Sequence, residues 1–250
     1  MKVEAIHRSR PEILPSKERP QLLIDVLTLT GHPGTGKTST IKALSPLLHI
    51  PKSRIFQAGE EFRALMKEDV LDYAKRSVNL DRELDSRMTE FMRNSLNAKP
   101  VIAEGRLAAW IAKRLVSDQI AGQNSDPLRV VSALLKADPE TKAQRVFGRD
   151  GKKNPDLTIE EVREKNVHRA TMDLRQWRKA YPELAEIDPL DSDLLDQNGE
   201  KVYDLIIDTG HLKVPEVVGT IYAFLLENGY VATKDENTTL SPHGQIYPNP

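Results

Sequence analysis

Two kinds of hydrophobic pattern alternate along this chain. Five short runs are apolar and rich in β-branched residues, as in strands buried on both faces of a sheet: 21–30, 54–58, 100–106, 128–137 and 202–208. Between them, apolar residues recur every three or four positions, which is the period of a helix. The helical segments are 40–48, 59–76, 81–97, 108–119, 140–181 and 215–228. Strands that alternate with helices predict an α/β domain with a mainly parallel sheet.

The two ends of the chain differ from this periodic middle. Residues 1–20 hold five Lys or Arg, three Asp or Glu and three Pro, and we interpret them as an N-terminal arm. The pattern of one domain extends over 21–230, and the proline-containing residues 231–250 form a C-terminal tail. At 250 residues, the chain is long enough to bury a sizeable core.

Composition excludes several classes of function. With 36 Lys and Arg against 37 Asp and Glu, the net charge of −1 argues against a protein that coats nucleic acid. The absence of Cys removes disulfides, thiolate metal sites and Cys nucleophiles, and the six His show no paired metal-ligand spacing. No run of 18 apolar residues exists, so no membrane span is predicted. We expect a cytoplasmic protein.

The segment after the first predicted strand, Gly31-His-Pro-Gly-Thr-Gly-Lys37-Thr38, fits the phosphate-binding pattern G-x-x-x-x-G-K-[ST]. Its glycines permit a tight loop whose N–H groups approach phosphates, and the next helix points its positive dipole end at them. Lys37 would reach the β- and γ-phosphates, and the Thr38 hydroxyl would join a Mg²⁺ shell. The strand before and the helix after favour nucleotide binding over a chance Gly-rich turn. The residues expected to bind the nucleotide are Gly31, Pro33, Gly34, Thr35, Gly36, Lys37, Thr38 and Ser39, and the loop alone leaves GTPase, ATPase motor and small-molecule kinase open.

Two further strand ends carry candidate ligands for a second phosphate. Glu104, Gly105 and Arg106 end the third strand, on the side of a doubly wound sheet that faces the ligand crevice. Glu104 can orient a water on Mg²⁺, and Arg106 can contact a phosphate or base in a bidentate manner; a salt bridge at the strand end is the alternative. Gly59 lies at the junction between the second strand and its helix, and Arg63 lies one turn into that helix, where a phosphate would also meet the helix N-terminus.

A basic stretch lies between residues 142 and 179, where 11 Lys or Arg stand against 6 Asp or Glu. Arginines brought in by a closing lid would stabilise the charge of a transferring phosphoryl group and exclude water. A solvated helical face is the alternative interpretation. At least half of the arginines are expected to pair at the surface with acidic neighbours such as Glu160, Glu161 and Asp173.

Six blocks occur in one order that resembles the archaeal-type cytidylate kinases among the P-loop nucleoside monophosphate kinases. They read GHPGTGKTS, QAGEEFRALMKE, LDRELDSRM, IAEGRLAAW, LKADPETKAQRVFGR and VYDLIIDT, and the resemblance spans about residues 22–228. It implies a P-loop kinase fold, which is a five-stranded parallel sheet with helices on both faces. It also implies a helical monophosphate-binding subdomain, here residues 59–98, and a lid region, here residues 140–181.

The resemblance also implies roles for individual residues. Lys37, Arg149 and Arg169 would be catalytic. The acceptor would be bound by Gly59, Arg63, Glu104, Gly105, Arg106 and Arg175. Mg²⁺, arriving with ATP, would be held by Thr38 and by Glu104 through a water.

The chain is therefore expected to transfer the γ-phosphoryl group of ATP to a nucleoside monophosphate, first of all CMP or dCMP. A kinase of the same fold that acts on another nucleotide or a small hydroxyl metabolite stays open, as does a nucleic-acid-end kinase. A GTP-dependent switch lacks its N-K-x-D guanine-reading motif here. We expect a monomer with no membrane partner and no stable nucleic-acid binding.

Overall fold

A computed structural model provides the three-dimensional view of the chain. It describes residues 21–66, 77–95, 100–122, 127–152 and 154–232, together with the backbone of 238–240 and 246–248. The expected N-terminal arm lies outside the described residues, and so do residues 67–76 of the helix expected over 59–76.

A parallel sheet of five strands forms the centre of the molecule, in the order β3-β4-β2-β5-β6. The strands are β2 (Val26–Thr30), β3 (Ile55–Gln57), β4 (Val101–Glu104), β5 (Val130–Lys136) and β6 (Leu205–Asp208). Each strand falls inside a predicted one, which confirms the α/β prediction. The central strand β2 is buried along its whole length, as its apolar run indicates.

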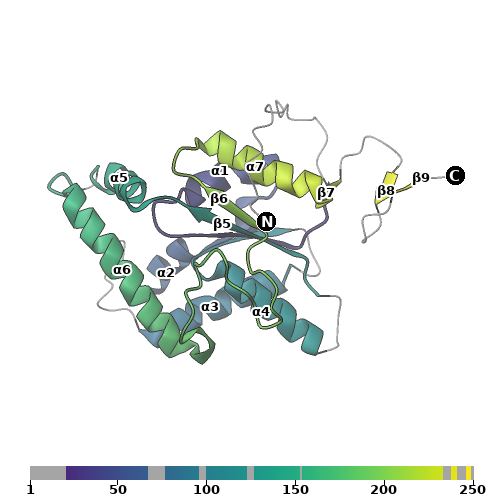
Figure 1. The fold of residues 1–250 in the computed structure, drawn as a ribbon, viewed down its shortest axis with the longest axis horizontal. Helices are drawn as coiled ribbons and strands as arrows, with labels where there is room; N and C mark the ends of the chain where they lie inside the picture. Colours follow the sequence, from purple (N-terminus) through teal and green to yellow (C-terminus); the bar gives the residue numbers. More distant parts are fainter. Residues whose placement is uncertain are drawn as a thin grey trace.

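Helices cover both faces of this sheet and one of its ends (Figure 1). One face is covered by α1 (Lys37–Leu47) and α7 (Val214–Glu227). The other face is covered by α2 (Ala58–Met66), α3 (Val78–Arg93) and α4 (Ala108–Ala121). The end of the sheet carries α5 (Pro139–Asp150) and α6 (Ile159–Ala180). Short 3₁₀ turns span Lys52–Arg54 (η1) and Pro182–Leu184 (η3).

The first predicted strand is shorter than expected, because Asp25 interrupts it. The Asp25 carboxylate accepts a hydrogen bond from the backbone N–H of Arg129 at 2.8 Å, and the strand proper begins only at Val26. The residues before the interruption form β1 (Gln21–Leu22), which pairs antiparallel with β7 (Val231–Ala232). A last pair, β8 (Thr238–Leu240) with β9 (Ile246–Pro248), lies in the C-terminal tail.

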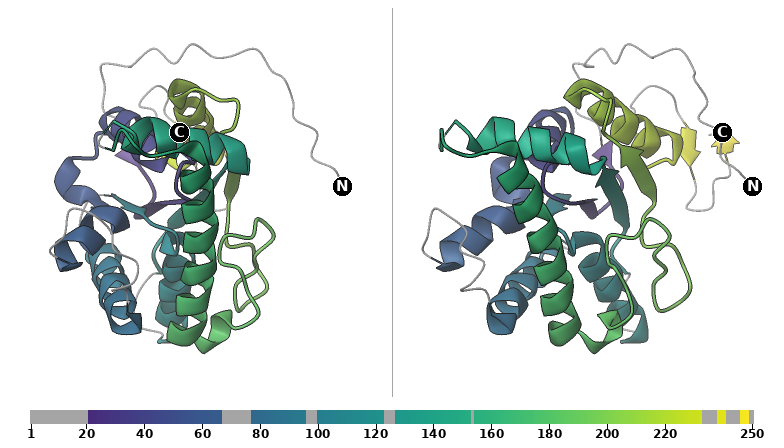
Figure 2. Two further views of the ribbon diagram at one scale, coloured as in Figure 1. Left: turned by 90° about the vertical axis from the view of Figure 1, so that its left-hand side faces the viewer. Right: turned by 60° about the vertical axis from the view of Figure 1, so that its left-hand side comes forward.

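The region expected to be helical over 140–181 consists of two helices, α5 and α6. Figure 2 shows α6 as one long helix with α5 lying across its end. The second helix begins with a capping box: the Thr158 side chain accepts from the backbone of Glu161, whose carboxylate accepts from the N–H of Thr158. A small core of Ala143, Val146, Leu157 and Val162 joins the two helices.

Capping side chains also explain where two other helices start. Ser77 caps α3 by accepting from the N–H of Leu80, so this helix begins three residues before the predicted Asp81. Asp138 caps α5 by accepting from the N–H of Thr141, and Pro139 occupies the favourable first helical position. Within the described ranges, no helix combines the length and apolar character that a membrane crossing needs.

Candidate active site

The loop between β2 and α1 is a compact phosphate-type loop built on positive φ angles. Gly31, Gly34 and Gly36 have φ values of 147°, 84° and 91°. A Cβ on Gly34 would lie 2.6 Å from the carbonyl oxygen of Lys142 in α5, and one on Gly31 would lie 2.3 Å from the carbonyl oxygen of Leu135. The loop therefore needs glycine both for its backbone conformation and for its close packing against β5 and α5.

Lys37, the first residue of α1, turns back over this loop. Its ammonium donates to the carbonyl oxygens of Gly31 at 2.7 Å and His32 at 3.0 Å, and it lies 3.6 Å from a carboxylate oxygen of Glu104. Only 9% of the residue is exposed. Burial lowers the pKa of Lys37 to about 8, against the opposing effect of Glu104 and with further lowering by Arg106 and Arg169.

The lowered Lys37 pKa predicts how the free energy of unfolding changes with pH, which stability measurements can check. The folded protein loses the Lys37 proton at about pH 8, whereas the unfolded chain keeps it to about 10.5. The unfolded state therefore binds more protons in this window, and the free energy of unfolding contributed by Lys37 rises with pH between these values.

Activity should fall over the alkaline range in which stability rises, because phosphoryl transfer needs the positive charge of Lys37. The value of kcat/KM, which reports the nucleotide-free enzyme, should fall as pH rises through about 8. Bound phosphates raise the Lys37 pKa, so the fall in kcat should come at higher pH. Lys37→Arg keeps its charge throughout and, although less active, should lack this fall. The check is a pH–rate profile of both proteins; an identical alkaline fall in Lys37→Arg would contradict the assignment.

The lowered pKa of His32 indicates that several positive charges lie near the loop. Its burial, together with the charges of Lys142, Arg106, Lys37 and Arg169, lowers its pKa to about 4. The imidazole is therefore neutral at physiological pH. The cations come from α1, α5, α6 and the turn after β4, and their fields converge at one point, as an anion-binding site requires.

Behind the loop, hydrogen bonds tie it to α5 and to the residue after β6. The Thr209 hydroxyl lies 3.0 Å from the carbonyl oxygen of Thr35 and 2.9 Å from that of Lys136. Arg145 of α5 donates to the Thr209 carbonyl oxygen at 2.6 Å and to its hydroxyl at 3.0 Å. Sequence reasoning missed Thr209, although it follows a parallel strand at the ligand-facing end, which was the available signal.

Arg106 leaves the end of β4 and is held by α6. Its guanidinium pairs with the Asp173 carboxylate and lies over the Trp177 ring, 5.4 Å from the centroid. The expectation that Asp173 makes a surface pair is wrong: its side chain is only 2% exposed, because α6 packs on α3 and its next turn carries Trp177 into the core. Gly105 allows the approach, since a Cβ there would lie 2.9 Å from the Met88 side chain of α3.

The two arginines predicted to be catalytic, Arg149 and Arg169, differ in exposure. Arg169 is half-buried on α6, and its charge acts on both Lys37 and His32. Arg149 is exposed at the end of α5, where it pairs with Asp150 at 2.6 Å.

Two predicted acceptor ligands, Arg63 and Arg175, differ in burial. Arg175 is exposed on α6. Arg63 is half-buried on α2, and its guanidinium folds back over Gly59, 3.9 Å from where a Cβ would stand. The structure thus brings Lys37, Glu104, Arg106 and Arg169 together. The roles of these four residues and of Arg63, Arg149 and Arg175 stay predictions.

Exposed hydroxyls and one carboxylate are available for a metal at the loop. Thr38 and Ser39 are exposed in the first turn of α1, and Pro33 is half-buried in the loop. In the part of the chain that the structure describes, no group of three or more His, Cys, Asp or Glu is placed to hold a metal ion. A metal ion at this loop would thus need ligands from a bound phosphate chain.

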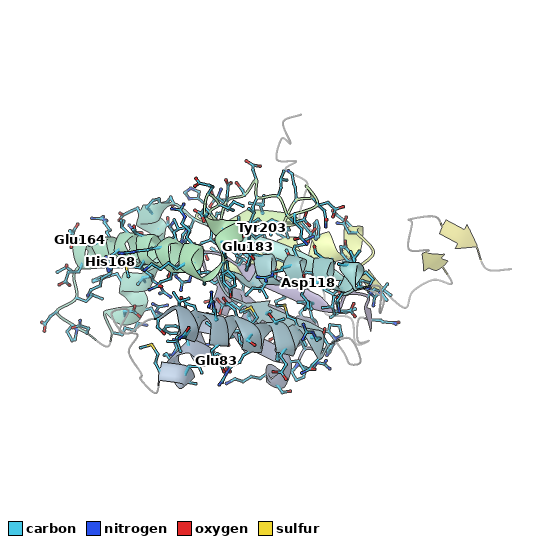
Figure 3. All side chains as sticks on the ribbon, turned by 90° about the horizontal axis from the view of Figure 1, so that it is seen from below. Glu83, Asp118, Glu164, His168, Glu183 and Tyr203 are labelled. Carbon is cyan, nitrogen blue, oxygen red and sulfur yellow. The ribbon has the colours of Figure 1, made fainter. Side chains whose placement is uncertain are left out.

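A groove of about 410 Å³ lies away from the loop, between α3, α4 and the residues after α6. Figure 3 shows this side from below, with Asp118 and Glu183 labelled. Its polar groups pair with one another: the Tyr181 hydroxyl donates to Asp85 at 2.6 Å, and Arg114 lies 3.0 Å from Glu183. Burial, with Asp85 beside it, raises the pKa of Tyr181 far above its usual range. These polar pairs, which join the residues after α6 to α3 and α4, hold the C-terminal end of α6 in place.

Comparison with known proteins places this site in a context. A family profile described as an AAA domain matches residues 27–168. A cytidylate kinase from Methanopyrus kandleri is 30% identical over 201 residues, covering 79% of this chain and 91% of that relative. One from Pyrobaculum aerophilum is 30% identical over 196 residues, covering 77% and 88%. A solved structure of an uncharacterized protein from Eubacterium ventriosum shares the fold, with a TM-score of 0.51 and 19% identity over 80% of this chain and 97% of that one.

Proposed function

This chain belongs to the cytidylate kinase family and to the AAA-domain family that its profile match defines, and we propose that it moves the γ-phosphoryl group of ATP to the phosphate of CMP or dCMP. The family makes it a nucleoside monophosphate kinase. The observation that carries the proposal is the buried ammonium of Lys37, bonded to the carbonyl oxygens of Gly31 and His32 and 3.6 Å from Glu104, with Arg106 and Arg169 near enough to act on its charge.

The glycine loop would bind ATP, the phosphoryl donor. Its N–H groups and the N-terminus of α1 suit the phosphates of ATP, and Lys37 supplies a fixed positive charge in a buried site. Charge that develops on the transferring group is stabilised most where water is excluded, because the local dielectric is low. Lys37 is already oriented by two carbonyl oxygens and by Glu104, so it needs little rearrangement before the reaction.

Magnesium is implied by the kinase family, and the residues present fit it. Thr38 offers an exposed hydroxyl in the first turn of α1, and Glu104 offers a carboxylate beside Lys37. These few oxygens suit an ion that keeps most of its ligands from water and phosphate. When bound, Mg²⁺ would neutralise charge on the transferring phosphates.

Arginines would grip the acceptor, whose own phosphate oxygen is the nucleophile. Arg106 follows the ligand-facing end of β4, and Arg63 lies in the last turn of α2, the helix that follows β3 directly. A guanidinium suits the phosphate of a monophosphate because it can donate two parallel hydrogen bonds. Holding both anions in line supplies most of what phosphoryl transfer needs, and no covalent intermediate with the protein is required.

An ADP-release assay over a panel of acceptors tests the proposed function. The panel holds CMP, dCMP, UMP, dTMP, AMP and GMP, together with small hydroxyl acids as the alternative class. CMP or dCMP is expected to give the highest kcat/KM, with one product diphosphate per ADP. A hydroxyl acid as the best acceptor, or ADP release that no acceptor changes, would replace the proposal.

Arg63→Ala should raise the KM for the monophosphate by about 10-fold to 100-fold, the range for loss of a charge-assisted hydrogen bond. The KM for ATP should change by less than about 3-fold, because Arg63 would serve only the acceptor. Arg93→Ala, at an exposed position in the last turn of α3, is the matched control and should change neither. Steady-state titration of each substrate measures both constants. An effect confined to ATP would place Arg63 on the donor side.

A further inference from the structure

A buried carboxylate stands in the middle of the long helix α6. The Asp173 side chain is 2% exposed and pairs with Arg106, which follows the end of β4. Burying a carboxylate is costly unless a partner and hydrogen bonds compensate it, so a site like this is built around its partner. The partner is the residue that the proposed function assigns to the acceptor phosphate.

Arg106 is fixed from two directions by the same helix. Asp173 pairs with its guanidinium, and Trp177, one helical turn later, lies under its face at 5.4 Å. Trp177 is itself buried in the core. A guanidinium carries five N–H donors in one plane, so pairing one of them with a carboxylate leaves others for a phosphate. The side chain of Arg106 is only 18% exposed, so most of its surface is covered by the protein.

The helix that carries this pair is anchored at both ends. At its N-terminal end, Arg163 pairs with Glu140 of α5 at 2.6 Å. At its C-terminal end, Arg82 of α3 donates to the carbonyl oxygen of Ala180 at 3.1 Å. The neighbouring Tyr181 hydroxyl bonds to α3 as described above. Asp173 lies between these anchors, where the helix can hold Arg106 in one position before any ligand arrives.

We propose that Asp173 is a positioning residue that aims the Arg106 guanidinium at the acceptor phosphate. This rests on the proposed function, because it needs a monophosphate acceptor at Arg106. The carboxylate also offsets one positive charge in a site that gathers Lys37, Arg106 and Arg169. Pre-orientation lowers the entropy lost when the acceptor binds, so Asp173 acts on acceptor affinity.

Three substitutions test the role. Asp173→Asn removes the charge at nearly constant shape and should raise the acceptor KM by about 10-fold, with the ATP KM changed less than about 2-fold. Asp173→Glu keeps the charge on a longer side chain and should give an intermediate rise. Glu164→Gln is the matched control: it lies on the same helix, exposed (Figure 3), and should change neither constant.

A double-mutant cycle separates positioning from a merely structural contribution. If Asp173 acts through Arg106, Asp173→Asn should have no further effect on the acceptor KM in an Arg106→Ala background. The acceptor is whichever monophosphate the wild type turns over fastest, and melting curves establish that each variant folds. Should Asp173→Asn not fold, the intermediate rise in Asp173→Glu is the deciding result.

Several outcomes would overturn the inference. An equal rise in both KM values, or the same effect with and without Arg106, would make Asp173 a packing residue only. An unchanged acceptor KM in a folded Asp173 variant would do so as well, while the kinase function would stand. A wild type that phosphorylates no monophosphate would remove the proposed function and this inference together.

Discussion

Replacing Lys37 with alanine should lower kcat by about two to four orders of magnitude, the range expected when a preorganised charge is lost from a transition state. The ammonium of Lys37 is buried, bonded to the loop carbonyls of Gly31 and His32, and adjacent to Glu104. No other side chain of α1 is placed to replace it, since the next two residues are the short Thr38 and Ser39. The loss should therefore fall on chemistry more than on substrate affinity.

Lys42 provides the matched control for this experiment. It lies in the same helix α1 but is exposed, so Lys42→Ala should leave kcat within about 2-fold of the wild type. Stopped assays of ADP and product diphosphate give the rates, and circular dichroism establishes the fold. Near-normal turnover by a natively folded Lys37→Ala protein would remove the glycine loop from the mechanism.

Gly34→Ala should be a strongly damaging small substitution in the loop. Its φ of 84° is unfavourable for a side chain, and a Cβ would lie 2.6 Å from the Lys142 carbonyl oxygen in α5. We expect a loss of about 2–4 kcal/mol in the free energy of unfolding, the sum of a left-handed backbone and a displaced helix. The KM for ATP should rise as well, because α5 and the loop move apart.

Alanine substitutions at two other glycines distinguish the cost of a left-handed backbone from the cost of a steric clash. Gly36 has a similar φ of 91° with nothing within 4 Å of a Cβ, so Gly36→Ala should cost only about 1–2 kcal/mol. Gly148, inside α5, also has open space, and Gly148→Ala should stabilise the helix by about 0.5–1 kcal/mol. Denaturant unfolding of the three variants measures these differences. Equal effects of Gly34→Ala and Gly36→Ala would show that packing on α5 is unimportant.

Much of the fold was predictable because buried parallel strands leave a strong local pattern. The run VLTLT of β2 and the run VVSALLK of β5 are nearly continuous apolar segments, and each is a strand. Asp25 inside an apolar run was a local sign that the strand begins later, but its partner Arg129 is 104 residues away in sequence and was not predictable. The break between α5 and α6 had a local signal too. Pro155 and the capping sequence Thr158–Glu161 both mark a helix start.

The candidate site was predictable in its loop and much less so in its arginines. The spacing from Gly31 to Thr38 predicts a phosphate loop by itself, because a few adjacent residues build it. The pair of Arg106 with Asp173 joins β4 to α6 across 67 positions, and only the packing of α6 on the sheet end brings the two together. A basic stretch indicates that arginines are present, but not which of them face the ligand; Arg169 acts on Lys37, whereas Arg149 pairs with Asp150.

Phosphorus NMR of the wild-type protein with ATP, Mg²⁺ and CMP tests the central claim most directly, because it shows where the transferred group goes. We predict that CDP and ADP appear together in equal amounts and that inorganic phosphate stays at its background level. Release of inorganic phosphate with ADP, while CMP is left unchanged, would contradict a site in which loop and arginines hold two phosphorylated ligands in line.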